Sequence, residues 1–153
     1  MALAFEKLLA PATGRPQTSD GETSESALTI AVVFTSVEST LSALRKAGSV
    51  ATSLNASITL MVPQIVPYPL PLTSPPVLLD FNERRFRVIA GESPIETTVR
   101  IYLCRDRFEM LKSELKRGSI VVIGARRSWW PTAERRMAAK LRRAGHSIIF
   151  AEH

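Results

Sequence analysis

The sequence predicts a single α/β domain built on a parallel sheet, and three observations indicate it. Short apolar runs rich in β-branched residues alternate with longer segments whose apolar residues recur at helical spacing, which gives the order β-α-β-α-β-α-β-α-β. Two of the runs, ALTIAVVF and SIVVIG, are apolar without alternation, as strands covered on both faces are. A chain of 153 residues, 45% of them apolar, fits one domain with its own core.

The first half of the predicted domain is a strand, a helix and a second strand. The strands are expected at residues 27–34 and 57–62. Thr35 or Ser36 caps the helix between them, and Glu38 places a negative charge in its first turn. The apolar stripe of this helix consists of Leu41, Leu44, Ala47, Ala51 and Leu54.

The second half continues the alternation after a long loop. Residues 63–76 are expected to form this loop, extended where prolines cluster, and a helix is expected at 77–90. The strand expected at 95–103 alternates in part between apolar and polar residues, which indicates a place near a sheet edge. The next helix is predicted to begin at Asp106 and to stop at Gly118. A final strand, helix and strand complete the order.

Residues 1–26 are expected to be a flexible N-terminal tail, and residues 27–153 the domain, because the segment PATGRPQTSDGETSES lacks the apolar surface that would offset the entropy of ordering. The uncharged stretch 47–79 is interrupted by six prolines, which exclude a membrane-spanning helix. Residues 1–10 lack the basic start of a signal peptide, and the single cysteine, Cys104, fits a reducing compartment. A cytoplasmic protein is therefore expected.

The charge balance favours an anionic partner. The net charge is +6, from 20 Lys and Arg against 14 Asp and Glu. Nucleotides, nucleic acids and membrane headgroups all match such a balance, and many basic proteins bind none of them. Because no segment spans or anchors in a bilayer by its pattern, a membrane partner is not expected.

Two loops are expected to form the functional end of the sheet. In α/β sheets of this kind, ligands bind outside the carboxyl ends of the strands, where the strand order reverses. These loops are Thr35–Val37 after the first strand and Gly124–Trp130 after the fourth. In the second loop, Arg126 and Arg127 suit phosphate or carboxylate groups, and the two tryptophans suit stacking on a base. The alternative is that the indoles fill space at the sheet edge or form a dimer contact.

The helix expected at 132–144 is strongly amphipathic. Its apolar residues gather on one side, and the other side carries Arg135, Arg136, Lys140, Arg142 and Arg143. One interpretation is a face that binds the phosphates of a nucleotide or a nucleic acid. The other is a solvated outer face whose cations interact favourably with the C-terminal end of the helix dipole.

Catalytic and metal-binding patterns are absent from the sequence. His146 and His153 are the only histidines, and no serine, base and carboxylate are spaced as a triad would need. Two histidines and one cysteine at these positions do not form a metal site by spacing. Cys104 fits a small buried hydrophobic residue better than a redox thiol. The chain is therefore expected not to be an enzyme and to hold no metal.

Several segments resemble the universal stress protein (UspA-like) family: TIAVVFTSVESTLSAL, the strands SITLMV and SIVVIG, and the closing helix and strand. This resemblance implies a three-layer domain with a five-stranded parallel sheet of order 3-2-1-4-5, of the flavodoxin-like, adenine nucleotide alpha hydrolase-like type. It also implies a homodimer and, in one branch of the family, ATP binding.

The chain departs from the pattern of the ATP-binding members, which carry an acidic residue after the first strand and a glycine-rich loop after the fourth. Thr35 stands at the acidic position; Gly124 matches the first glycine of the loop, but Arg127 replaces the second, and the final Gly-Ser pair has no match. Side chains in this turn keep backbone amides from closing on phosphates. The resemblance implies ATP or AMP as possible cofactors. The altered loop lacks most of the residues that would bind either one, so no cofactor is expected.

The resemblance and the residues together predict a degenerate, non-catalytic stress-response or signalling module, in which nucleotide binding is lost or non-standard. The predicted ligand residues are Thr35, Ser36, Gly124, Arg126, Arg127 and Ser128. The alternative function is binding of nucleic acid or an anionic partner through the basic face at 135–143, and a nucleotide-dependent enzyme is the least favoured.

Overall fold

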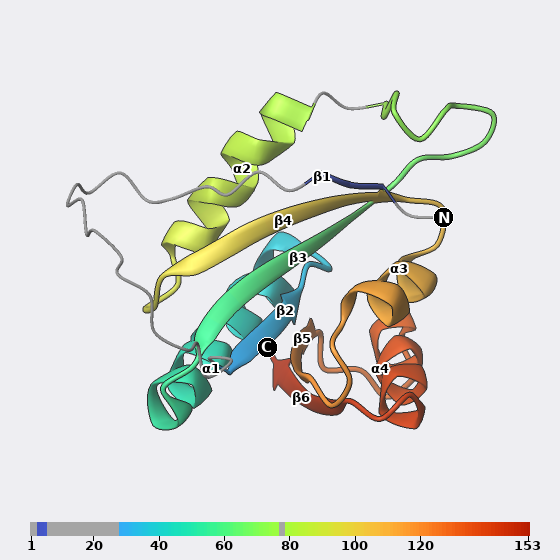
Figure 1. Ribbon diagram of the computed structural model, residues 1–153. Coiled ribbons are helices and arrows are strands. Elements are labelled where there is room, and N and C mark those ends of the chain that lie inside the picture. The colour runs from blue at the N-terminus through green and yellow to red at the C-terminus, as the bar shows by residue number, and fades with distance from the viewer. Residues whose placement is uncertain (1–2, 6–27, 77–78) are drawn as a thin grey trace.

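The computed structural model of the chain describes residues 3–5, 28–76 and 79–153, which form three layers with a twisted sheet between helices (Figure 1). The strands are β1 (Leu3–Phe5), β2 (Thr29–Val33), β3 (Ser57–Ile65), β4 (Thr97–Cys104), β5 (Ile120–Ala125) and β6 (Ser147–Glu152). The helices are α1 (Val37–Leu54), α2 (Leu79–Gly91), α3 (Arg107–Glu114) and α4 (Ala133–Arg143). None of the described helices is long and apolar enough to cross a membrane.

The predicted parallel sheet is confirmed. The strand order is β1-β4-β3-β2-β5-β6, and all pairs from β4 to β6 are parallel. Numbering these five strands along the chain gives the order 3-2-1-4-5. The chain therefore builds outward from β2 in one direction through β3 and β4, and in the other through β5 and β6.

A sixth strand lies where the sequence predicts a flexible tail. β1 pairs antiparallel with β4, with Leu3 opposite Leu103 and Phe5 opposite Ile101. The prediction of a tail is thus wrong for Leu3–Phe5, and the other residues of the predicted tail lie outside the described part of the chain. β4 is the edge of the parallel sheet, as its partial alternation predicts, and β1 covers that edge.

The sheet separates two apolar clusters, which explains why its strands read as continuous apolar runs. On one face α1 and α2 pack on a cluster that includes Ile30 and Val122. On the other face α3 and α4 pack on a cluster that includes Val121 and Ile123. Neighbouring residues of one strand therefore face opposite layers, and both need apolar side chains.

Local capping signals set most helix ends. The Ser36 side chain accepts a hydrogen bond from the Ser39 amide at the start of α1, and Asn55 follows α1 in the left-handed conformation, with φ 50°. Asp106 and Thr132 cap α3 and α4 in the same way as Ser36. Each of these polar side chains satisfies an amide that the first helical turn leaves without a backbone partner.

Two boundaries differ from the expectation. β3 runs through Pro63 to Ile65, and this is tolerated because its pairing with β2 ends at Met61, so the missing N–H faces no strand. α3 ends at Glu114 instead of at Gly118: Leu115 is already extended, and Gly118, with φ 73°, belongs to the turn that follows. The short α3 leaves part of the sheet face beside it without a helix.

Candidate functional site

The candidate site lies at the carboxyl ends of β2 and β5, which are neighbours in the sheet. α1 follows β2 on one face of the sheet and α4 follows β5 on the other, so the chain leaves these two strands in opposite directions (Figure 1). This is the place where a doubly wound sheet forms its ligand crevice.

Thr35 and Gly124 meet at this point, as the sequence predicts. The Thr35 hydroxyl donates a hydrogen bond of 3.2 Å to the carbonyl oxygen of Gly124. The Thr35 amide donates to the hydroxyl of Thr40, at 3.3 Å. The Thr35 side chain therefore links the loop after β2 to β5, so a residue that the sequence predicts as a ligand contact has a partner within the fold.

Gly124 belongs to β5 and is buried, not part of an open loop. A Cβ at this position would overlap the carbonyl group of Ser39 in α1. Glycine is thus required here because the helix backbone lies directly on the strand. Its role in the structure is close packing of α1 on the sheet.

Glu38 enters the site from the first turn of α1. Its Oε2 atom lies 3.9 Å from Nη2 of Arg126 and 3.8 Å from Nε2 of His153. The sequence indicates Glu38 only as a partner of the helix dipole, since nothing local shows that β5 and β6 end beside it. The Glu38 side chain is 73% exposed, so its contact with Arg126 contributes little to stability but offsets part of the positive charge.

The loop after β5 forms an open hollow of about 520 Å³. Its lining consists of Arg127, Ser128, Trp129, Arg135 and Glu152.

Hydrogen bonds fix the residues of this hollow. The Arg127 amide donates to the carbonyl oxygen of His153, at 3.3 Å, and the Ser128 hydroxyl accepts from the Trp130 amide, at 3.2 Å. Arg135 reaches the hollow from α4, and its Nη2 donates to Oε1 of Glu152 at 2.8 Å. Two guanidinium groups and one carboxylate therefore share a solvent-facing site.

Both indoles point into solvent, which contradicts the interpretation that they fill space at the sheet edge. Trp129 is 102% exposed and Trp130 is 80% exposed. The loop from β5 to α4 spans residues 126–132, and both indoles lie outside the packed core. Their ring faces are free for contact with another molecule.

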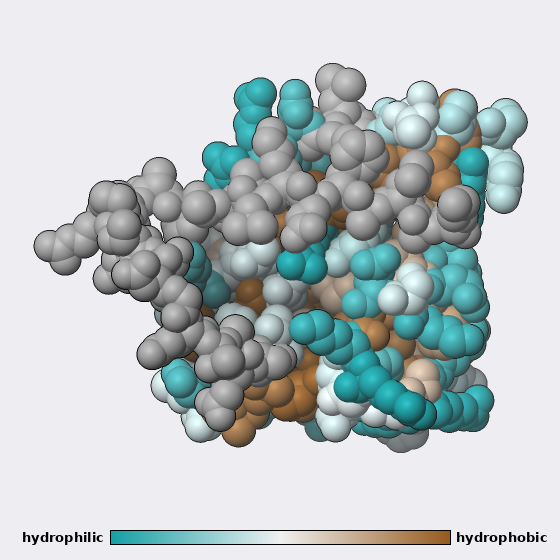
Figure 2. Space-filling model, viewed as in Figure 1, coloured by the Kyte–Doolittle hydropathy of each residue, from teal (hydrophilic) through white to brown (hydrophobic). Residues whose placement is uncertain are grey.

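The amphipathic prediction for α4 is confirmed. Met137, Ala138 and Leu141 are buried against the sheet. Lys140 lies over the ring of Phe108, and Arg142 lies over the ring of Phe150, at 5.2 and 5.4 Å from the centroids. Hydrophilic residues gather over α4 at the lower right of the space-filling view (Figure 2). The face keeps its positive charge because aromatic rings, not carboxylates, support these cations.

Cys104 and His146 are both buried. Burial raises the pKa of the Cys104 thiol above its ordinary value; Arg107 opposes this and Asp106 adds to it. Cys104 is thus kept protonated, as a structural thiol is. In the described part of the chain, no three or more His, Cys, Asp or Glu residues gather as a metal site would require.

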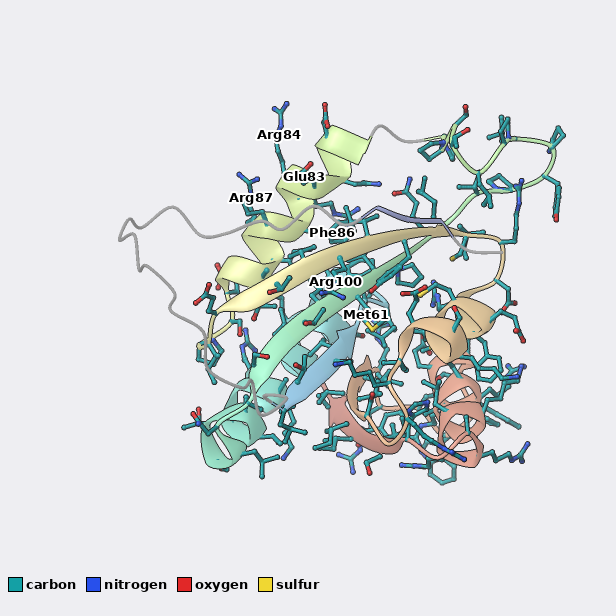
Figure 3. The ribbon with its side chains drawn as sticks, viewed as in Figure 1. Met61, Glu83, Arg84, Phe86, Arg87 and Arg100 are labelled. Atoms are coloured by element: carbon teal, nitrogen blue, oxygen red, sulfur yellow. The ribbon has the colours of Figure 1, made fainter. Side chains whose placement is uncertain are left out.

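A second hollow, of about 350 Å³, lies between the amino end of β2, the middle of β3 and β4, and the segment before β5, away from the switch point. The turn after α3 borders it, and Met61 and Arg100, paired in register on β3 and β4, form part of its floor (Figure 3). The sequence did not indicate this hollow, because it exists only where the short α3 leaves the sheet face open.

The comparisons with known proteins support the fold. No family model matches the chain, and no curated protein matches it by sequence. Among solved structures, a universal stress protein in complex with cAMP is similar, with a TM-score of 0.51 and 16% identity. The similarity covers 81% of this chain and 95% of the other. The chain therefore has the α/β fold of a universal stress protein.

Proposed function

We propose that the chain is a non-catalytic module of the universal stress protein type that binds a nucleotide phosphate with arginine side chains in place of glycine-rich backbone amides. The observation that carries the proposal is the hollow beside the switch point, which Arg127 and Arg135 line together with Trp129. The structural neighbour is in complex with cAMP, which supports a nucleotide as the class of ligand.

Each lining residue suits one part of a nucleotide. The guanidinium groups of Arg127 and Arg135 match the oxygens of a phosphate, and the Ser128 hydroxyl offers a further donor. The exposed face of Trp129 suits a base. Glu152 opposes phosphate binding, because its carboxylate forms an ion pair with Arg135 that a phosphate would have to replace.

The residues at the neighbouring positions favour binding through arginine side chains over binding through the backbone amides of a glycine-rich loop. Thr35 donates its hydroxyl to Gly124, and the Gly124 backbone lies against α1. Neither residue presents an acidic group or a free glycine turn to a nucleotide. A non-catalytic role fits the absence of a paired nucleophile and base around the described hollow, whose only carboxylate, Glu152, is bound to an arginine.

Titration calorimetry with AMP, ATP and cAMP tests the proposal. We expect micromolar to millimolar binding of at least one nucleotide, and a loss of about tenfold or more in Arg127→Ala or Arg135→Ala, as for a charge-assisted hydrogen bond. Arg45→Ala with Lys46→Ala removes two exposed cations of α1 and serves as the control. Nucleotide affinity that is unchanged in both arginine variants would contradict the proposal, as would no heat with any nucleotide.

The stress-response role, the cytoplasmic location and the homodimer belong to the same proposal and rest on the family resemblance. Sedimentation of the full chain with and without nucleotide tests the dimer directly. A monomer at all concentrations would remove the homodimer from the proposal and leave the nucleotide site to be judged by calorimetry alone.

A further inference from the structure

The loop after β5 and the outward side of α4 form one continuous surface, which we call the Trp-Arg surface. It consists of Arg127, Trp129, Trp130, Arg136, Lys140 and Arg143. The last three are spaced by four and three residues, so they lie in one exposed row along the helix. Nη2 of Arg136 lies 3.4 Å from the carbonyl oxygen of Pro131, which joins this row to the end of the loop.

In the described part of the chain, none of the four cations of the Trp-Arg surface forms an ion pair. The ion pairs of this region join Arg126 to Glu38 and Arg135 to Glu152. No described carboxylate lies within 4.0 Å of Arg127, Arg136, Lys140 or Arg143. Glu134 belongs to α4 but lies on the side of the helix opposite the row. The surface therefore carries a net positive charge along its whole length.

The two indoles add flat apolar faces at one end of this charged row. They are the only tryptophans of the chain, and both are exposed. Exposed large aromatic side chains next to each other are unfavourable in water and commonly mark a binding surface. The indoles lie beside cations that form no ion pair. This combination favours a ligand that has both planar apolar groups and repeated negative charges.

We propose that the Trp-Arg surface binds single-stranded nucleic acid, with bases stacked on Trp129 and Trp130 and phosphates along Arg136, Lys140 and Arg143. Unpaired bases expose their faces to such aromatic platforms, whereas a duplex keeps them stacked on one another. A membrane is the poorer match, because the apolar side of α4 is buried in the core and cannot enter a bilayer. The α4 row and Trp130 lie outside the lining of the nucleotide hollow, so this inference goes beyond the proposed function.

Fluorescence anisotropy with the full chain tests the proposal, using fluorescein-labelled 12-nucleotide oligothymidylate and oligouridylate as probes. We expect binding that weakens with salt, by about 0.7 in logarithmic slope for each phosphate neutralised. Since both tryptophans lie in the surface, binding should also quench the intrinsic fluorescence of the protein. Trp129→Ala with Trp130→Ala should weaken binding by about fivefold or more and leave most of the salt dependence in place.

Two triple variants separate a defined surface from general positive charge. Arg136→Ala, Lys140→Ala and Arg143→Ala together should lower the salt slope by about two. The control, Arg45→Ala, Lys46→Ala and Arg117→Ala, removes the same number of exposed cations outside the surface and should leave the slope nearly unchanged. Circular dichroism of each variant verifies folding, which these exposed positions should not disturb.

Several outcomes would overturn the inference: no oligonucleotide binding, equal weakening by both triple variants, tighter binding of a duplex of the same length, or equal competition by polyglutamate or anionic vesicles. The nucleotide proposal is judged separately. Nucleotide binding should persist when the α4 row is removed. Oligonucleotide binding without binding of AMP, ATP or cAMP would contradict the nucleotide proposal and support this one.

Discussion

The backbone of Ser39 in α1 lies directly against Gly124 in β5, with its carbonyl group where a Cβ of residue 124 would stand. The contact brings the start of α1, and with it Ser36 and Glu38, to the carboxyl end of β5. The geometry of the switch point therefore depends on the absence of a side chain at position 124.

Gly124→Ala should destabilise the fold strongly. Neither partner can move as a flexible side chain would, since the overlap is with helix backbone, so the cost should reach or exceed the 1–3 kcal/mol typical of overpacking. Gly91→Ala is the matched control, because a Cβ there meets no atom within 4 Å. Urea unfolding of both variants measures the difference, and equal midpoints for Gly124→Ala and the native chain would contradict the contact.

Glu152→Gln should strengthen anion binding at the hollow. Glu152 accepts from Arg135 at 2.8 Å, so removing its charge frees the guanidinium for a phosphate. We expect AMP affinity to rise a few-fold, with a stability change of at most about 1 kcal/mol because both side chains are partly exposed. Glu114→Gln removes an equal, exposed charge away from this hollow and is the control in the same calorimetric titration. Weaker AMP binding in Glu152→Gln would mean that Glu152 holds Arg135 in its binding position.

Both tryptophans should report an aqueous environment in the folded protein. Because the indoles are exposed, the fluorescence emission maximum should stay nearly constant on unfolding in urea, and acrylamide should quench native and unfolded protein to similar extents. A blue-shifted native emission that moves to the red on unfolding would show buried indoles and would contradict the exposed loop. Repeating the scan across protein concentrations separates burial within one chain from burial in a dimer.

Signals within a few residues allowed much of the fold to be predicted. The Ser36, Asp106 and Thr132 caps are local hydrogen bonds between a side chain and an amide three residues on, so the sequence shows them directly. The continuous apolar runs likewise predict β2 and β5 as buried parallel strands. Local patterns therefore predict the helices and strands, and the family resemblance predicts the order of the strands in the sheet.

The parts that the sequence did not predict depend on contacts between distant segments. β1 exists because Leu3–Phe5 pair with β4, and three residues carry no periodicity that could show it. The meeting of Glu38 with His153 requires β6 to end beside α1. Whether Trp129 plugs a gap or faces solvent depends on how tightly the chain turns from β5 into α4. The sequence thus places these residues at the ends of strands and helices, but it does not show which residues they contact.

Cys104 should react slowly in the folded protein and make stability fall at alkaline pH. Burial raises its pKa, so the native thiol keeps its proton when the unfolded one has lost it. Both states bind the proton below the ordinary thiol pKa of about 8.5. Above it the unfolded state binds fewer protons than the native state, and the free energy of unfolding therefore decreases as the pH rises toward the native pKa. Iodoacetamide labelling at pH 8 should be much slower in buffer than in urea.

The Cys104→Ala variant isolates this contribution from the other groups that titrate at alkaline pH. It removes the thiol and leaves a small apolar residue in the buried position, so the variant should lose less stability than the native chain between pH 8 and pH 10. Urea unfolding at each pH measures the two slopes. Parallel slopes for the two proteins, or equally fast labelling in buffer and in urea, would mean that the thiol is accessible and that burial does not set its pKa.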